Sequence, residues 1–211
     1  MGICVGHSAY PDCGGCEWCG RLKSRIVNIR GTVPPVYMDV LKAIETRRSV
    51  RKFKHILMPD GDLKKVLEAG RLAPSAGNKQ PWGFVVVRDA DRRKKLATAA
   101  SNQMWTAEAG VFLAVFGDAA NSPGGYGKWV ERDPLIAVEN MILAAWSLGY
   151  GTCWIGAFDE AKVKALLDIP EDKKVICLLP IGVPAETPDP KPRRALKEVF
   201  HAETYGKPME F

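Results

Sequence analysis

Apolar residues recur at helical spacing in five parts of the chain. Each recurrence places hydrophobic side chains along one side of a helix, and polar residues, glycine or proline mark the ends. The longest is apolar around most of its circumference, which predicts a central helix ended by Gly149. The predicted helices run from Tyr37 into the basic stretch RRSVR (47–51), and over 60–73, 89–100, 131–151 and 159–169.

Short runs rich in β-branched and aromatic residues lie between these helices. Glycine, aspartate or proline bounds each run, which is typical of buried strands. Asp60 or Asp62 is the expected N-cap of the second helix, and Asp159 that of the last. The order of elements suggests a sheet covered by helices. The predicted strands are GFVVVRD (83–89), GVFLAVFGD (110–118), GTCWIGAF (151–158) and KVICLLPIGVP (174–184).

The two ends of the chain differ from this pattern. Residues 1–36 are rich in glycine and cysteine and end at two prolines, which predicts an N-terminal extension separate from a globular domain over 37–211. Residues 185–211 begin with several prolines and carry apolar side chains that could anchor the tail on another surface, a partner subunit being one candidate.

Composition limits the class of protein. The 211 residues suit one domain of ordinary size, and a net charge of +6 with a pI near 9.0 favours an anionic partner. No run approaches the roughly 18 apolar residues of a membrane span. The N-terminus has cysteines and charges where a signal peptide is apolar. We therefore expect a cytoplasmic protein with no membrane partner.

Several common catalytic motifs are missing. Trp154 stands where a dinucleotide loop needs its third glycine, and Gly127-Lys128 is followed by tryptophan where a P-loop needs Ser or Thr. There is no G-x-S-x-G elbow and no H-E-x-x-H. What remains is a set of cations with a hydroxyl, at 47–51 and 191–194. Arginine forks and a serine hydroxyl suit a phosphate dianion, although a solvated surface gives the same pattern.

Four ordered segments of the chain resemble the nitroreductase family of FMN-dependent oxidoreductases. The resemblance extends from about Tyr37 to Tyr205. It implies an α+β fold in which a central mixed, mainly antiparallel β-sheet is flanked by helices, with the Cys-rich N-terminal extension added. The segments are IETRRSVRKF (44–53), RLAPSAGNKQPWGFVVV (71–87), SLGYGTCWIGAFD (147–159) and IGVPAETPDPKPRRALKEVF (181–200).

The resemblance implies an FMN site at the interface of a homodimer. The cations and serine of the basic stretch, Arg47, Arg48, Ser49 and Arg51, would grip the phosphate and ribityl chain, and Lys191, Arg193 and Arg194 would close on the phosphate. The backbone N–H near Gly156 would point at flavin N5. The remaining implied contacts to the flavin ring are Pro74, Ser75, Ala76 and Asn78 from the other subunit, and Asn102, Trp154, Ile155 and Ala157.

The implied reaction is a ping-pong transfer. NAD(P)H would pass hydride to the flavin and leave, and a nitroaromatic, quinone or similar small-molecule acceptor would then take the electrons. In this family the flavin performs the redox chemistry, so no catalytic side chain is expected.

The cysteines of the extension predict a metal site. Cys13, Cys16 and Cys19 form a C-x2-C-x2-C array like the first three ligands of a bacterial ferredoxin cluster, and Cys4 could be the fourth. A [4Fe–4S] cluster or a zinc site of four thiolates both fit, as do free or disulfide-linked thiols.

Two other functions remain open. The first is a ferredoxin-linked or flavin-fragmenting enzyme of the same fold that does not use NAD(P)H. The second is a nucleic-acid-binding protein with a zinc knuckle at 4–19. The chain lacks the exposed aromatics among basic residues that single-strand binding requires, so no nucleic-acid partner is expected.

Overall fold

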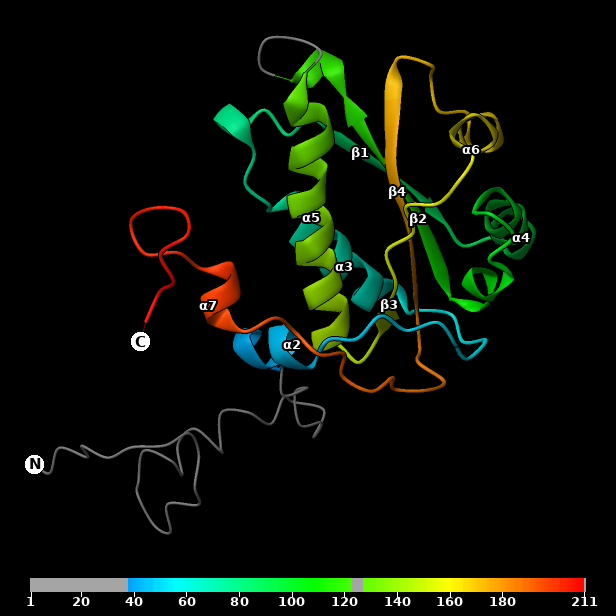
Figure 1. Cartoon of the computed structure of the whole chain (residues 1–211). Coiled ribbons are helices and arrows are strands. Elements are labelled where there is room, and N and C mark those ends of the chain that lie inside the picture. Colours follow the sequence, from blue (N-terminus) through cyan, green and yellow to red (C-terminus); the bar gives the residue numbers. More distant parts are fainter. Residues whose placement is uncertain (1–37, 123–126, 211) are drawn as a thin grey trace, which may run out of the picture. The chain divides into compact units, whose positions relative to one another are not determined.

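The computed structural model describes residues 38–122 and 127–210 (Figure 1). All of them belong to one compact unit, Met38–Phe211. The predicted metal ligands Cys4, Cys13, Cys16 and Cys19 lie outside the described residues.

A four-stranded sheet forms the centre of the described unit. Its strands are β1 (Trp82–Val87), β2 (Val111–Asp118), β3 (Gly151–Thr152) and β4 (Lys173–Gly182), in the order β1-β2-β4-β3, and all three pairings are antiparallel. A single parallel bridge joins Ser49 to Thr152 beside β3. The predicted mixed, mainly antiparallel sheet is therefore confirmed.

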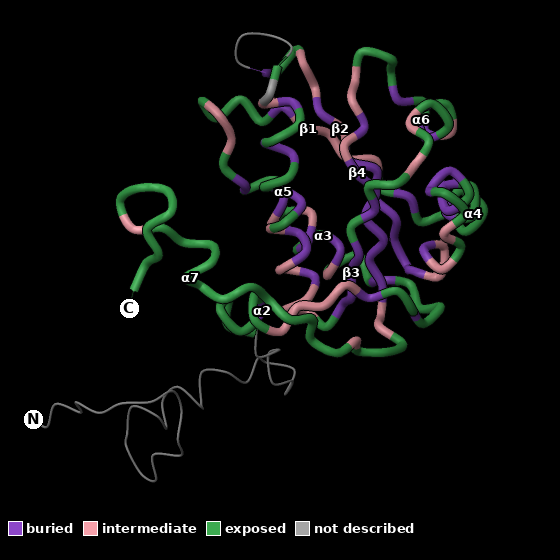
Figure 2. Tube along the Cα trace, viewed as in Figure 1, coloured by how far each residue is buried: buried purple, intermediate pink, exposed green. Residues whose placement is uncertain are grey.

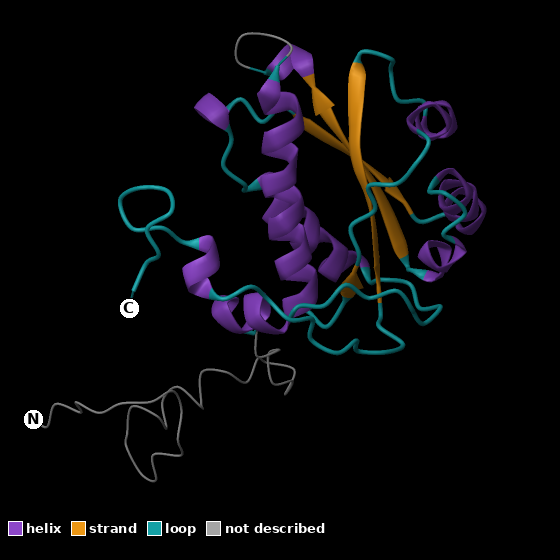
Figure 3. Ribbon diagram, viewed as in Figure 1, coloured by secondary structure: helices purple, strands orange, loops and turns teal. Residues whose placement is uncertain are grey.

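Helices cover both faces of this sheet (Figures 1 and 3). On one face lie α3 (Asp60–Arg71) and α5 (Lys128–Ser147), which pack on Val111, Leu113 and Val115 of β2. On the other lie α4 (Ala90–Ala99) and α6 (Glu160–Leu167), against Phe112 and Ala114. Alternate residues of β2 thus enter two cores, which explains its unbroken apolar run. The remaining elements are α2 (Val40–Thr46), α7 (Leu196–Val199) and the 3₁₀ turns η1 (Ala76–Asn78), η2 (Met104–Glu108) and η3 (Ala119–Asn121).

The central helix α5 differs from its prediction in extent and exposure. It starts at Lys128, before the predicted start at 131, and includes Pro134. It ends at Ser147 because Gly149 adopts a φ of +86°, in the left-handed region that favours glycine. Leu135 and Ile136 stay exposed, so part of its apolar circumference faces outward (Figure 2).

Two further predictions about the elements were wrong. The N-cap residue of α3 is Pro59, and the carboxylates of Asp60 and Asp62 bind Arg88 and Lys65 instead. The strand expected over 151–158 forms a ladder only at Gly151–Thr152, with one further bridge at Ile155.

Candidate functional site

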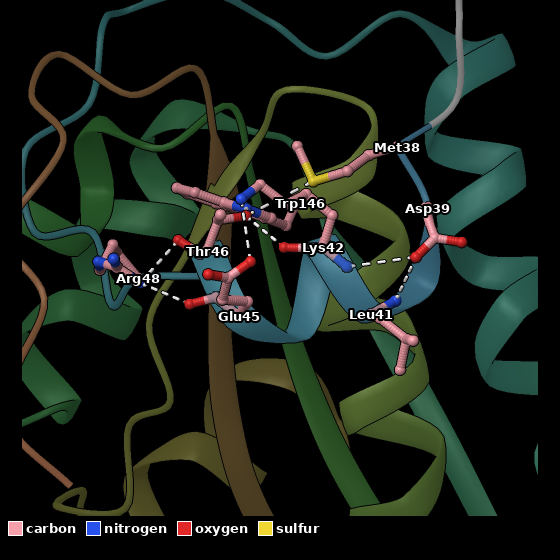
Figure 4. A network of polar contacts seen from close by, with 8 residues as sticks. All are labelled: Met38, Asp39, Leu41, Lys42, Glu45, Thr46, Arg48 and Trp146. Atoms are coloured by element: carbon pink, nitrogen blue, oxygen red, sulfur yellow. Dashed lines mark hydrogen bonds and ion pairs between the residues drawn. The ribbon is translucent and has the colours of Figure 1, made fainter. Parts of the chain in front are cut away.

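A hydrogen bond holds helix α2 against α5, and further polar contacts within residues 38–48 order the segment that leads into the basic stretch (Figure 4). Trp146 of α5 donates its indole N–H to the Thr46 hydroxyl at 3.0 Å, and that hydroxyl donates to the Lys42 carbonyl at 2.6 Å. At the other end of α2, the Asp39 carboxylate accepts from the Leu41 N–H at 2.9 Å. The end of α2 therefore has a defined position at which residues 47–51 begin.

The basic stretch continues as an extended segment between two other parts of the chain. Val50 N–H donates to the Thr152 carbonyl beside it at 2.9 Å, and Lys54 N–H donates to the Val183 carbonyl at 2.8 Å. A Cβ at Gly151 would lie 2.6 Å from a Val50 methyl, so this close approach requires glycine. The chain leaving β4 therefore runs alongside the basic stretch, which brings residues 188–193 against residues 47–51.

These two segments enclose a cavity of about 530 Å³, which we call the cationic cavity. It brings together two groups of predicted phosphate ligands that are about 140 residues apart in the sequence. Its lining residues are Ile44, Glu45, Arg47, Arg48, Ser49, Arg51, Pro188, Asp189, Pro190, Lys191 and Arg193.

The cations of this cavity differ from those elsewhere on the surface. Among the described residues, no acidic side chain forms an ion pair with Arg47, Arg51, Lys191 or Arg193. By contrast, the neighbouring Lys52 is paired with Glu186 at 3.3 Å. The cavity therefore gathers positive charge that no described carboxylate neutralises directly, as a phosphate site requires.

A second cavity of about 300 Å³, the adjoining cavity, shares Arg47 and Ser49 with the first. A ligand with an anionic end and a flat apolar body could extend from one cavity into the other. Its lining residues are Arg47, Ser49, Glu139, Ile142, Thr152, Cys153 and Trp154.

Residues 154–157 continue from the adjoining cavity, with Trp154, Gly156 and Ala157 exposed and Ile155 buried. Within residues 38–122 and 127–210, the N–H of Gly156 has no acceptor at hydrogen-bond distance. The preceding residue, Ile155, is paired with Leu178 of β4: each of the two donates its N–H to the carbonyl of the other. The Ser101 hydroxyl contacts the Ala157 carbonyl at 3.4 Å, which places the neighbouring Asn102 close to this segment. The segment thus offers a free backbone donor, and its contact with a flavin ring stays a prediction.

The predicted residues Pro74, Ser75, Ala76 and Asn78 line neither cavity. Their loop is held elsewhere on α5, where the Ala76 N–H donates to the buried Asp133 carboxylate at 2.9 Å. Within one chain, this loop and the cationic cavity are therefore separate.

Arg193 donates to the carbonyls of Lys191 and Pro192 at 3.2 and 3.3 Å, and two further predicted phosphate ligands are also occupied by local contacts. Arg48 donates from one guanidinium nitrogen to the carbonyls of Glu45 and Thr46 at the end of α2, at 3.1 and 2.8 Å. Arg194 lies outside the lining of the cationic cavity and donates to the Glu198 carbonyl at 2.6 Å. Arg48 and Arg194 thus stabilise the backbone beside the cavity.

Sequence reasoning missed two acidic residues of α5, Asp133 and Glu139. Burial raises the pKa of the Glu139 carboxyl, and the Arg47 charge offsets part of that rise. The sequence carried one signal for these two residues. A carboxylate within a mostly apolar helix is energetically costly unless a hydrogen-bond donor or a positive charge nearby compensates for it.

The described residues contain neither a metal-ligand cluster nor a helix that could cross a membrane. Residues 38–122 and 127–210 contain no group of three or more His, Cys, Asp or Glu side chains placed to hold a metal ion. In the same ranges, no helix has the length and apolar character to cross a membrane.

Comparison with known proteins identifies the family. The sequence model described as "Nitroreductase family" matches residues 44–138 and 127–183, which together span more than half of the chain. The chain belongs to the nitroreductase family.

Individual relatives have several names. A protein of Archaeoglobus fulgidus, provisionally named NADH dehydrogenase/NAD(P)H nitroreductase, is 40% identical over 72% of this chain and 88% of its own length. The NADPH-flavin oxidoreductase of Vibrio harveyi is 31% identical over 79% of this chain and 75% of its own. The 5,6-dimethylbenzimidazole synthase of Rhodospirillum rubrum is 31% identical over 72% of this chain and 85% of its own.

Solved structures agree with the fold. The NADPH:FMN oxidoreductase of Vibrio harveyi, solved as a complex with NAD+, superposes with a TM-score of 0.73 at 30% identity. That match covers 80% of this chain and 78% of the solved one.

Proposed function

We propose that this protein is an FMN-dependent oxidoreductase that moves electrons from NAD(P)H to a nitroaromatic, quinone or similar small-molecule acceptor. The observation that carries the proposal is the cationic cavity, where cations without an acidic partner among the described residues and the Ser49 hydroxyl surround a space that adjoins a second cavity. Family membership and the Vibrio harveyi oxidoreductase support the same activity.

The residues present fit the parts of FMN. Arg47, Ser49, Arg51, Lys191 and Arg193 would hold the phosphate, because their donors have no competing carboxylate. Arg48 and Arg194 would support the backbone of this site and add positive charge around it.

The ring would lie along residues 154–157. The free N–H of Gly156 would hydrogen-bond to an acceptor atom at the ring edge, and the missing side chain would leave the ring face open to a second molecule. Trp154, Ile155, Ala157 and Asn102 would border the ring.

When bound, FMN supplies the exchange of two electrons between NAD(P)H and the acceptor in alternating half-reactions. The chain's own part is to bind the phosphate, orient the ring and leave one face accessible. The binding of NADH or NADPH and then an acceptor at the same place corresponds to a ping-pong scheme.

We further propose that the protein acts as a homodimer. Pro74, Ser75, Ala76 and Asn78 are separate from the cationic cavity within one chain, so their predicted contact with the ring would come from a second copy. The C-terminal arm, residues 185–210, also exposes Leu196, Val199 and Phe200, which a partner would cover.

Anaerobic spectroscopy tests the proposed activity. Full-length protein supplied with FMN should show flavin absorbance that bleaches with NADH or NADPH and returns when a quinone is added. A protein that binds no FMN would contradict the proposal.

The relative named 5,6-dimethylbenzimidazole synthase favours a second candidate function. In that case the protein binds flavin but does not use NAD(P)H. Bound flavin that neither nicotinamide reduces, but that a ferredoxin does, would support it.

A metal site at the N-terminal cysteines stays a prediction, and metal analysis of anaerobically purified protein tests it. The predicted ligands are Cys4, Cys13, Cys16 and Cys19. A cytoplasmic location also stays a prediction.

A further inference from the structure

Arg47 is shared between the proposed phosphate site and a carboxylate. It lines the cationic cavity with Ser49, and both residues also line the adjoining cavity with Glu139. The flavin phosphate and the Glu139 carboxylate would therefore both interact electrostatically with the Arg47 guanidinium.

Glu139 lines the adjoining cavity together with Arg47. Its side chain reaches solvent, yet the surrounding protein removes part of its water, and this partial burial raises the pKa of its carboxyl. The positive charge of Arg47 lowers the same pKa, because it favours the ionised form of the carboxyl.

The other ionisable groups around the two cavities do not replace Arg47. Cys153 faces the same cavity, and burial raises the pKa of its thiol, so it carries no charge near neutral pH. Arg51 lines the cationic cavity, where its charge would also interact with the phosphate. Glu45 forms an ion pair with Lys42 at 2.9 Å. Within α5, the neighbours of Glu139 one turn away are apolar: Leu135, Ile136, Ile142 and Leu143.

We propose that Glu139 takes up a proton when FMN binds, because the phosphate takes over the charge of Arg47 that stabilises the Glu139 carboxylate. The inference rests on the proposed FMN site. It makes Glu139 a determinant of flavin affinity that acts through Arg47.

The sign of the pH dependence follows from linkage. A carboxyl that holds its proton more tightly in the complex than in the free protein strengthens binding as pH falls. Ionised Glu139 therefore weakens FMN binding at high pH, and this penalty disappears once Glu139 is protonated.

Calorimetric titration of FMN into flavin-free, full-length protein tests the inference. Buffers of different ionisation enthalpy give the number of protons exchanged, for the wild type and for Glu139→Gln. FMN itself contributes, since a phosphate monoester has a second pKa of about 6, but this contribution is common to both proteins. The wild type should take up as much as one proton more than the variant.

Affinity provides an independent readout. FMN should bind the two proteins equally at acidic pH and should bind Glu139→Gln more tightly at alkaline pH, by about tenfold for each unit by which FMN raises the pKa of Glu139. Glu131→Gln is the matched control, because it changes an exposed carboxylate of the same helix that lines neither cavity, and its proton count should equal that of the wild type.

The outcomes separate this inference from the proposed function. Equal proton counts and parallel pH profiles for wild type and Glu139→Gln would overturn the inference and leave the FMN site intact. Failure of both proteins to bind FMN at any pH would overturn both.

Discussion

At the scale of single residues, Gly156 lies where the fold leaves room for a side chain. A Cβ built there would meet only the Trp154 indole nitrogen, at 3.8 Å, and the φ of Gly156 lies outside the left-handed region. Folding therefore does not require glycine at this position. A ligand that approaches the backbone closely does.

Gly156→Val should consequently separate function from stability. We expect a thermal midpoint close to that of the wild type, and a rate of flavin reduction by NAD(P)H lowered about tenfold or more, which corresponds to about 1.4 kcal/mol of lost transition-state stabilisation. Stopped-flow absorbance measures this rate. Gly61→Val, which adds the same side chain at another open glycine, is the control. Equal reduction rates for the two variants would contradict the assigned role of Gly156.

Single residues also show what the sequence could and could not predict. The placement of Arg47, Ser49, Arg51, Lys191 and Arg193 in one cavity agrees with a prediction from the density of cations and the family resemblance. The contribution of Glu139 could not be predicted, because it depends on which side of α5 faces Arg47.

At the scale of elements, a buried carboxylate joins α5 to the loop that precedes β1. Asp133 is only 3% exposed and accepts from the Ala76 N–H. The same loop places Gly77, Asn78 and Gln80 at positive φ, so its conformation needs support from outside.

Asp133→Ala should destabilise the protein by about 1–3 kcal/mol, because the Ala76 N–H loses its acceptor in a partly buried place. Asp133→Asn keeps an acceptor oxygen and should lose less. Urea unfolding measures both changes. An alanine variant as stable as the wild type would show that the loop does not depend on this hydrogen bond.

A second contact between elements makes stability depend on pH. Lys173 at the start of β4 binds Asp118 at the end of β2 at 2.7 Å, and both side chains are mostly buried. The hydrogen bond from Lys173 lowers the pKa of Asp118 below its ordinary value of 3.8. A lowered pKa means that the stabilisation is present above that value and is lost as pH falls through the folded-state pKa.

Asp118→Asn should therefore lose less stability than the wild type on acidification below about pH 4. Urea unfolding at a series of acidic pH values measures the difference. Asp91→Asn, which changes an exposed aspartate of α4, should retain the wild-type pH profile. Parallel acid profiles for Asp118→Asn and the wild type would refute the linkage.

The elements themselves were largely predictable because their hydrophobic periods are clear. The β3 region was not, since an alternating run marks extended backbone whether or not it pairs. Cys153 and Ile155 are buried while Trp154 and Gly156 are exposed, so the alternation persists beyond the ladder. Pairing depends on neighbouring strands, which the local sequence does not specify.

At the scale of the whole molecule, apolar side chains remain exposed on several elements. Leu41 and Ile44 of α2 are 73% and 55% exposed, and Phe200 of the C-terminal arm is 50% exposed. Figure 2 shows the arm as almost entirely exposed. Such residues are typical of a surface that a second copy covers.

Sedimentation equilibrium should accordingly give twice the chain mass of 23.2 kDa. Leu196→Asp with Phe200→Asp should weaken dimerisation at least about tenfold, because two charges would enter an apolar interface. Leu57→Asp, at an exposed apolar residue outside α2 and the arm, is the control. A wild type that stays monomeric at high concentration would contradict the proposed homodimer.

FMN titration of the wild type and of Arg47→Ala with Arg193→Ala tests the central claim most directly. The double variant removes two proposed phosphate donors, one from each segment that lines the cationic cavity, and leaves the core intact. The account predicts that it stays folded and binds FMN at least about a hundredfold more weakly, from about 1.5–3 kcal/mol for each charged hydrogen bond. Lys64→Ala with Arg92→Ala, which removes the same charge elsewhere, should bind normally. Unchanged FMN affinity in the Arg47 and Arg193 variant would show that the flavin phosphate binds elsewhere.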